Sequence, residues 1–386
     1  MSPENGVVVT WRLTLEPAGF DVAWSLLRAS GDAPAVAVDG GLFEDAHHLA
    51  AVAESVRPRP VGDGQSTRWD SDLLDPALEA SAAHLFGQRL LPEAVRSAVL
   101  QDRCVEDPRH EIEIAARGWV ATLPWDAFAV DDDLTRLAEL VVVRSAMSPG
   151  VIAHRARTTE WGDADDPGLA IIDPGPASGP LGSIFAGESE RYPALLWGPN
   201  GLAVNDMVAP GAHPMSRNDA AELLADGGWS RLLYLGHVQA PDPDSPADAA
   251  LVFERQGRPD LLSAARWLAW PERWPAPPRV ALIACGSDDA AYLETSGLPA
   301  AAVNAGARLV TTTRWPLPAD RHDEGARGTT ELMLAVHRAH RQSAPVRALR
   351  TWQVEQLERW RTRPSFESSP LLWAALSTYA VPGETR

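Results

Sequence analysis

A histidine and a cysteine each come directly after a short apolar run in this chain. The run Leu232–Gly236 leads to His237, and the run Val280–Ala284 leads to Cys285. Continuous apolar runs of this length are typical of buried strands in a parallel sheet, where ligands bind outside the carboxyl ends of the strands. If the two strands are neighbours, the imidazole lies beside a thiol that it can deprotonate, and the thiolate is a nucleophile. The pattern predicts a cysteine hydrolase.

The residues after the cysteine suit acyl transfer. Gly286 and Ser287 permit a tight turn from strand to helix, in which the backbone N–H groups of Cys285 and Gly286 face a developing oxyanion. A plainer interpretation stays open, because cysteine is among the most buried residue types and a histidine at a strand end is often only a hydrogen-bonded structural residue.

Composition limits the classes of function. The 386 residues are 45% hydrophobic and 22% charged, as in ordinary globular proteins, and no stretch is apolar enough to span a membrane. The net charge of −18, with arginine as every one of the 34 cationic residues, argues against nucleic acid as a partner. We see no secretory signal and expect a cytoplasmic protein with two free thiols, Cys104 and Cys285. His337 and His340 have no third ligand nearby, so we expect no metal.

Two domains are expected, at residues 1–155 and 160–386, with a boundary in the acidic, aliphatic-poor stretch 158–168. The first is a mixed α+β region. It should contain a hairpin over residues 6–24, helical segments over 74–100, and strands over 110–114, 119–122 and 140–143.

The second domain alternates strands with helices, which predicts a mostly parallel α/β sheet flanked by helices. Strands are expected at 169–172, 232–236, 280–284, 307–313 and 371–381, a hairpin near 251–254, and helices at 216–225, 298–305, 323–340 and 346–360. Ser216 and Asp219 are spaced as a capping box, and Gly306 is placed to end a helix.

A series of short motifs resembles the CHAT domains, which are caspase-like peptidases related to separase. The motifs, in the order of the family, are Leu123–Asp126, Ile172–Pro174 with Glu188 and Glu190, Gly236–His237, Ile283–Cys285, Gly297–Leu298, Asn304–Arg308, Arg314–Leu317, Asp320 and Trp373–Leu376. The similarity runs from about residue 110 to residue 383. Each motif is weak alone, but their shared order makes the combination specific.

The resemblance implies a caspase-like fold and peptide-bond cleavage without a cofactor, with His237 as the base and Cys285 as the nucleophile. It also implies a role in bacterial conflict or regulated-death systems. The family has glycine after the histidine, and its N–H helps to form the oxyanion hole; here Val238 stands there, with a narrower range of φ. The tetratricopeptide repeats typical of the family are absent, so the first hundred residues are either a degenerate caspase-like half or a partner-docking module.

Specificity is undecided in the sequence. Relatives that cut after basic residues place an acid two positions before the cysteine, where this chain has Ile283. Asp173 can supply a negative wall for a basic side chain, Arg314 can attract an acidic one, and Trp315 can line the substrate site. Alternatively Asp173 caps a turn, Arg314 stacks on Trp315, and the indole belongs to the core.

Three tryptophans fall within residues 266–275, where they predict either helical packing before a proline-stiffened loop or a contact with a partner. We therefore expect a cysteine endopeptidase that cleaves a protein or peptide and is controlled by a regulatory protein partner. The alternative is a catalytically silent caspase-like scaffold that binds a partner peptide in the same groove.

Overall fold

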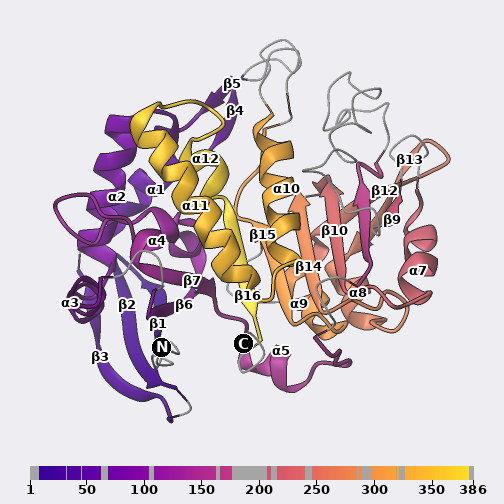
Figure 1. Ribbon diagram of the computed structural model, residues 1–386, viewed down its shortest axis with the longest axis horizontal. Helices are drawn as coiled ribbons and strands as arrows, with labels where there is room; N and C mark the ends of the chain where they lie inside the picture. The colour runs from indigo at the N-terminus through magenta and orange to yellow at the C-terminus, as the bar shows by residue number, and fades with distance from the viewer. Residues whose placement is uncertain are drawn as a thin grey trace, which may run out of the picture. The chain divides into compact units, whose positions relative to one another are not determined.

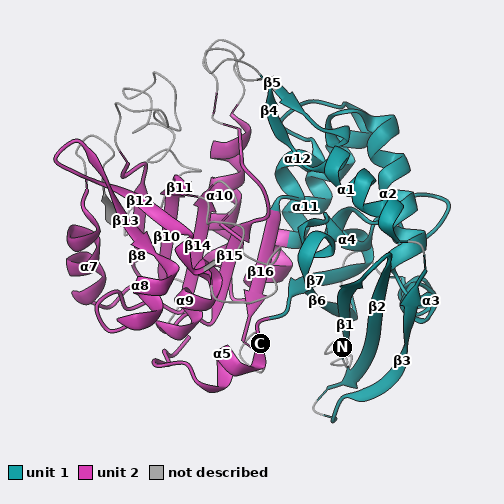
Figure 2. Ribbon diagram, turned by 180° about the vertical axis from the view of Figure 1, so that it is seen from behind, with its two compact units in different colours: residues 1–146, 350–375 teal, residues 147–349, 376–386 magenta. Residues whose placement is uncertain are grey.

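The computed structural model describes residues 8–31, 33–44, 46–61, 68–103, 108–161, 166–175, 207–209, 215–239, 246–284, 287–288, 297–318, 320 and 327–381. The chain divides into two compact units (Figure 2). The first comprises Met1–Ala146 and Arg350–Ala375, and the second comprises Met147–Leu349 and Leu376–Arg386. Residues 350–375 thus pack with the N-terminal unit, whereas the sequence-based domains run without interruption as 1–155 and 160–386.

The second unit is built on a mostly parallel sheet, in the order β16-β15-β14-β10-β8-β9 (Figure 1). Its strands are β8 (Gly168–Ile172), β9 (Met207–Ala209), β10 (Arg231–Gly236), β14 (Arg279–Ala284), β15 (Leu309–Thr313) and β16 (Leu376–Ala380). All neighbouring pairs are parallel except β15 and β16. Every residue of β8, β10 and β14 is buried, as expected for strands covered on both faces.

Helices flank this sheet, and the predicted α/β class is confirmed. They are α5 (Pro149–Ala153), α7 (Arg217–Ala225), α8 (Ala264–Ala269), α9 (Leu298–Asn304) and α10 (Gly328–His340). The predicted capping box of α7 is present, with Ser216 Oγ accepting from the N–H of Asp219. Gly306 ends α9 at φ +127°, where a Cβ would lie 2.9 Å from the Ala276 carbonyl oxygen, so only glycine fits this left-handed position.

A separate three-stranded antiparallel sheet follows β10, in the order β11-β12-β13. Its strands are β11 (Val238–Gln239), β12 (Ala250–Arg255) and β13 (Arg258–Ser263), with the short helix η4 (Pro246–Asp248) before β12. One of its faces packs into the core of the second unit through Val238, Leu251, Phe253 and Leu262. The hairpin predicted near residues 251–254 is therefore confirmed.

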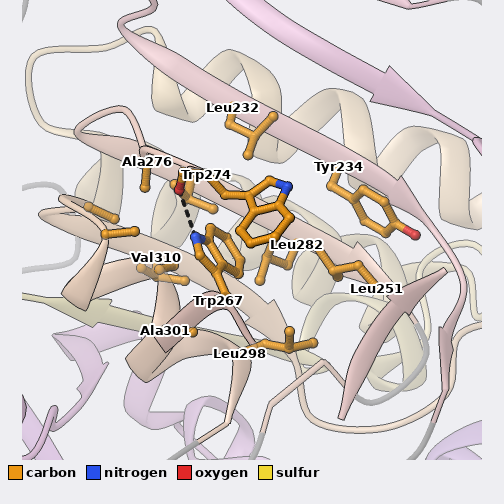
Figure 3. Packing of buried hydrophobic residues seen from close by; sticks show 14 of the residues in the cluster. Leu232, Tyr234, Leu251, Trp267, Trp274, Ala276, Leu282, Leu298, Ala301 and Val310 are labelled. Atoms are coloured by element: carbon orange, nitrogen blue, oxygen red, sulfur yellow. Dashed lines mark hydrogen bonds between the residues drawn. The ribbon is translucent and has the colours of Figure 1, made fainter. Parts of the chain in front are cut away.

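Tryptophans reinforce the same core (Figure 3). Trp267 and Trp274 are 1% and 2% exposed, and the indole N–H of Trp267 donates to the Trp274 carbonyl oxygen at 2.8 Å. The helical-packing interpretation therefore holds for these two residues. Trp270, between them in sequence, is exposed and leaves the partner-contact alternative open.

The first unit contains strands in the order β3-β2-β1-β6-β7, in which antiparallel pairs lie beside parallel ones. Its strands are β1 (Val9–Ala18), β2 (Asp21–Ser30), β3 (Val36–Phe43), β6 (His110–Ala116) and β7 (Val141–Ser145), with a small ladder of β4 (Arg59–Val61) and β5 (Arg68–Asp70). Its helices are α1 (His47–Val56), η1 (Asp72–Leu74), α2 (Pro76–Leu90), α3 (Glu93–Gln101), η2 (Gly118–Thr122), η3 (Trp125–Ala127), α4 (Leu137–Leu140) and α12 (Pro370–Trp373). The α+β character expected for this region is confirmed.

Helix α11 (Pro345–Thr362) enters the first unit at Arg350. Hydrogen bonds join this part of α11 to the first unit. Arg350 donates to the carbonyl oxygens of Val141 and Glu139, at 3.2 and 2.6 Å. The Trp360 indole donates to Glu79 at 3.4 Å.

Two predicted strands are wrong. The segment 119–122 forms the 3-10 helix η2, because Gly118 takes φ +63° and turns the chain at the end of β6. The segment 371–381 begins as helix α12, with Ser369 before Pro370 at the first helical position, and only Leu376–Ala380 is a strand.

Candidate functional site

The two strands that precede the predicted dyad are neighbours. Strands β10 and β14 pair in parallel, with Gly236 opposite Ala284. The next residues in the sequence are His237 and Cys285, so the predicted adjacency of the two strands is confirmed. Cys285 and Gly286 themselves lie outside the described residues, as do Cys104, Glu188 and Glu190.

The backbone of His237 is fixed by a buried tyrosine. The His237 carbonyl oxygen lies 2.9 Å from the Tyr234 hydroxyl and accepts the N–H of Val252 at 3.0 Å. The same hydroxyl lies 2.8 Å from the Val252 carbonyl oxygen and accepts the Val252 N–H at 3.1 Å. One phenol therefore ties the end of β10 to β12.

Glycine at position 236 makes room for this tyrosine. A Cβ there would lie 2.6 Å from the Tyr234 hydroxyl, closer than real Cβ atoms come. The sequence analysis missed Tyr234, although a signal was present: a tyrosine inside a buried strand needs a partner for its hydroxyl, and here that partner is the site backbone.

The imidazole of His237 is half-buried and adjoins Gly175. A Cβ on Gly175 would lie 3.8 Å from His237 Cδ2 and 3.7 Å from Val252 Cγ1. His237 and Val252 therefore present their side chains to the same side of the β11–β12 ladder, as directly opposed residues in an antiparallel pair do. An alanine at position 175 would thus make ordinary van der Waals contact with the imidazole.

Val238, the departure from the family pattern, has its side chain in the core, 8% exposed. Opposed residues of an antiparallel ladder alternate between hydrogen-bonded and non-hydrogen-bonded pairs. Because the Val252 N–H bonds to His237, the next pair, Val238 and Leu251, is of the second kind. The Val238 N–H consequently points away from β12 and makes no bond within the β11–β12 ladder.

Hydrogen bonds hold Ser287 and Asp288, the described residues that follow Cys285 and Gly286. The Ser287 hydroxyl donates to the Leu282 carbonyl oxygen at 2.6 Å and accepts the N–H of Thr313 at 3.0 Å. The Tyr379 hydroxyl donates to Asp288 Oδ1 at 2.5 Å. Strands β14, β15 and β16 thus all anchor the segment that follows the cysteine.

The three predicted specificity residues occupy different environments. Asp173 directly follows β8, with φ +49°, and its N–H donates to the Leu235 carbonyl oxygen at 2.6 Å, so it lies at the same edge of the sheet as His237. Arg314 is 8% exposed and donates to the Leu376 carbonyl oxygen, and Trp315 is 1% exposed. In this structure Arg314 and Trp315 therefore belong to the interior.

Neither a metal cluster nor a spanning helix is found in the described ranges. No group of three or more histidine, cysteine, aspartate and glutamate side chains there is placed to hold a metal ion. No helix in the described part of the chain is long and apolar enough to cross a membrane.

The fold and site define an α/β protein whose mostly parallel sheet has a histidine at the carboxyl end of a central strand. The family model of the CHAT domain matches residues 80–382, and the chain belongs to that family. This confirms the resemblance seen in the motifs and places the chain in a caspase-like protease family. The match begins earlier than the motifs and includes most of α2 and all of α3.

Two solved structures are also similar, both of a separase–securin complex from Saccharomyces cerevisiae. They match with TM-scores of 0.41 and 0.40, at 11% and 10% sequence identity. The matches cover 70% of this chain but only 16% and 15% of those chains, so this chain spans about a sixth of their length. The comparison with curated proteins gives no match.

Proposed function

We propose that this protein is a cysteine endopeptidase that cleaves a protein partner with His237 and Cys285. The observation that carries the proposal is the parallel register of β10 and β14, which sets Gly236 opposite Ala284. Neighbouring strands lie about 4.8 Å apart, and consecutive Cα atoms are about 3.8 Å apart. Because His237 follows Gly236 and Cys285 follows Ala284, the two residues leave their strands close to each other. Membership of a caspase-like protease family supports the same assignment.

The chemistry follows that of other thiol hydrolases. His237 takes the proton of the Cys285 thiol, and the thiolate attacks the carbonyl carbon of the scissile peptide. The N–H groups of Val238, Cys285 and Gly286 stabilise the oxyanion of the tetrahedral intermediate. His237 then returns the proton to the amine as the C–N bond breaks, leaving a thioester that water, deprotonated by His237, hydrolyses to the acid and the free thiol.

Contacts at the ends of β8 and β10 support the roles of His237, Val238 and Asp173. The Tyr234 hydroxyl and the Val252 N–H hold the His237 backbone. The Val238 N–H makes no bond within the β11–β12 ladder, which supports its role as an oxyanion donor in spite of the missing glycine. Asp173 remains our candidate for binding a basic side chain, because it follows the strand next to β10 at the same edge.

The biological setting is proposed on the family resemblance alone. We infer a bacterial regulatory or conflict system in which a regulatory protein partner controls cleavage. The first unit, whose N-terminal part precedes the matched residues, is our candidate for docking that partner.

A silent scaffold is the second candidate, and Val238 in place of glycine is the observation that favours it. The test is co-expression of the protein with candidate partners encoded beside it. Cleavage of a partner by the wild type, lost in Cys285→Ala and in His237→Ala, supports the enzyme. Stable binding of an uncleaved partner by wild type and both variants supports the scaffold and overturns the proposal.

A further inference from the structure

A hollow of about 420 Å³ lies on the small antiparallel sheet of the second unit, beside β11. Its lining includes Gln239 at the end of β11, Ser263 at the end of β13, and the arginines Arg217 and Arg266. Arg217 is the first residue of α7, and Arg266 lies on α8. Residues of two helices and of the strands of the small sheet thus line the hollow.

The hollow is on the same face of this sheet as the His237 imidazole. His237, Val252 and Leu261 form one row across the three strands, and Gln239, Ala250 and Ser263 form the next row on that face. Successive residues of a strand point to opposite faces, so side chains two apart share a face, about 6–7 Å from each other. Val252 and Ala250 are buried, whereas His237 is half-buried and Gln239 is exposed, so the accessible route along this face runs past His237 and Gln239. A peptide bound at His237 and extending along β11 reaches the hollow within about two residues.

Positive charge is concentrated here in a chain whose net charge is −18. Burial lowers the pKa of the Arg217 guanidinium, and the positive charges of Arg266, Arg273 and Arg255 lower it further, while Asp260 raises it. Three further arginines therefore lie close enough to Arg217 to act on its charge. Asp248 also lines the hollow, so the charge is not purely positive.

The two lining arginines differ in how they are engaged. Arg217 donates to the Leu261 carbonyl oxygen at 2.7 Å and lies 3.3 Å from Asp260 Oδ1. For the Arg266 guanidinium, the described part of the chain provides no ion pair and no hydrogen bond. Arg266 is therefore ready to donate to a carboxylate, and charge-assisted bonds of this kind are about twice as strong as neutral ones.

We propose that this hollow is a substrate subsite that binds an aspartate or glutamate side chain of the cleaved protein, about two residues from the scissile bond, through Arg266. The proposal rests on the proposed function, because it takes His237 as the position of the scissile bond. The ligand is a peptide carboxylate. It is a different determinant from the buried Arg314 considered in the sequence analysis.

The test uses a set of fluorogenic octapeptides with neutral residues, in which one glutamate or one glutamine occupies each position in turn. The wild type should cleave the glutamate peptide faster at one position, by about tenfold in kcat/KM, the value of a single charge-assisted bond. Arg266→Ala should abolish that preference by lowering the rate for the glutamate peptide to that for the glutamine peptide. Arg266→Glu should prefer lysine at the same position.

Arg258→Ala is the matched control, because Arg258 is an exposed arginine of the same sheet that does not line the hollow. It should keep the glutamate preference. A wild type that cleaves the peptides with no glutamate preference at any position, or a preference unchanged in Arg266→Ala, overturns the subsite.

Binding to the Cys285→Ala protein separates failure of the subsite from failure of the proposed function. Fluorescence anisotropy of labelled glutamate and glutamine peptides should show tighter binding of the glutamate peptide. The double variant Cys285→Ala, Arg266→Ala should bind the two peptides equally. If such binding is seen while the wild type cleaves nothing, the enzymatic proposal fails and the acidic subsite stands. If cleavage is seen but neither peptide binds better, the subsite fails alone.

Discussion

At the scale of single residues, the candidate site depends on side chains that do no chemistry. The imidazole of His237 is half-buried, but its position is set by the main chain, which the Tyr234 hydroxyl joins to β12. Gly236 leaves the space that the tyrosine ring needs, and Gly175 adjoins the imidazole. A strand end built in this way fixes the backbone from which the imidazole of His237, the proposed general base, projects.

Tyr234→Phe tests this positioning role. We expect the variant to lose about 1–3 kcal/mol of stability, because buried groups lose a partner. We also expect the pH profile of Cys285 alkylation to change shape, with kcat falling more than KM rises in a peptide assay. A purely structural tyrosine would lower stability and leave the alkylation profile as it is.

Ser230→Ala provides the control for the loss of a buried hydroxyl. Ser230 precedes the other end of β10, and its hydroxyl donates to the Asp166 carbonyl oxygen at 2.8 Å. This variant should lose comparable stability but keep the wild-type alkylation profile. Identical profiles for Tyr234→Phe and Ser230→Ala would contradict the positioning role.

At the scale of elements, a buried ion pair holds the helices of the first unit together. Arg136, which precedes α4, donates to both carboxylate oxygens of Glu79 on α2, at 2.9 and 3.0 Å, and both side chains are 3% exposed. Burial lowers the pKa of Arg136, and the charge of Glu79 opposes that effect. The Trp360 indole of α11 adds a third element to the cluster.

Glu79→Gln should destabilise the protein by about 3–5 kcal/mol, because it leaves the Arg136 charge buried without its counterion. Urea unfolding followed by circular dichroism would measure the change in midpoint. Glu93→Gln, in a pair whose glutamate is 73% exposed, should cost less than about 1 kcal/mol. The ion-pair account fails if the two variants cost the same, or if adding Arg136→Met to Glu79→Gln restores no stability.

Elements with a strong local pattern were predictable from the sequence. The apolar runs of β8, β10 and β14, the capping box of α7 and the glycine after α9 each carry their own signal, and the structure has all of them. The mostly parallel arrangement of the strands followed from the alternation of strands and helices. Their shared edge then brought Asp173 and His237 to one end of the sheet.

Features that depend on distant contacts were not predictable. The return of residues 350–375 to the first unit rests on hydrogen bonds to residues more than two hundred positions earlier, such as Arg350 to Val141. The segment 119–122 has strand-like residues, but the left-handed Gly118 decides its conformation. Tyr234 looked like one more apolar strand residue, and the rows that join His237 to the arginine-lined hollow appear only with the register of β11 and β12.

At the scale of the whole molecule, one buried histidine should shape the response to acid. Burial lowers the pKa of His340 from 6.5 to about 3, and the positive charges of Arg279 and Arg231 and the neighbouring His337 act in the same direction. The Thr311 hydroxyl lies 2.9 Å from His340 Nε2. The native state therefore keeps this imidazole neutral where the unfolded chain protonates it.

This difference in proton uptake makes the native state less stable as the pH falls. Between pH 6.5 and about 3 the unfolded state binds a proton that the native state excludes, so stability is full above pH 6.5 and falls as the pH drops towards 3. His340→Gln should flatten this part of the curve of unfolding free energy against pH. His154→Gln, at an exposed position, should leave its slope unchanged, and equal slopes in His340→Gln and the wild type would contradict the account.

The proposed function requires the imidazole of His237, after β10, to take the proton of the Cys285 thiol, after β14. The most direct measurement is the alkylation rate of each of the two cysteines by iodoacetamide at neutral pH, read by mass spectrometry, in the wild type and in His237→Ala. The account predicts that Cys285 reacts much faster than Cys104 in the wild type, and that His237→Ala removes most of that difference. Equally slow alkylation of both cysteines, or a Cys285 rate that does not change without the imidazole, would contradict it.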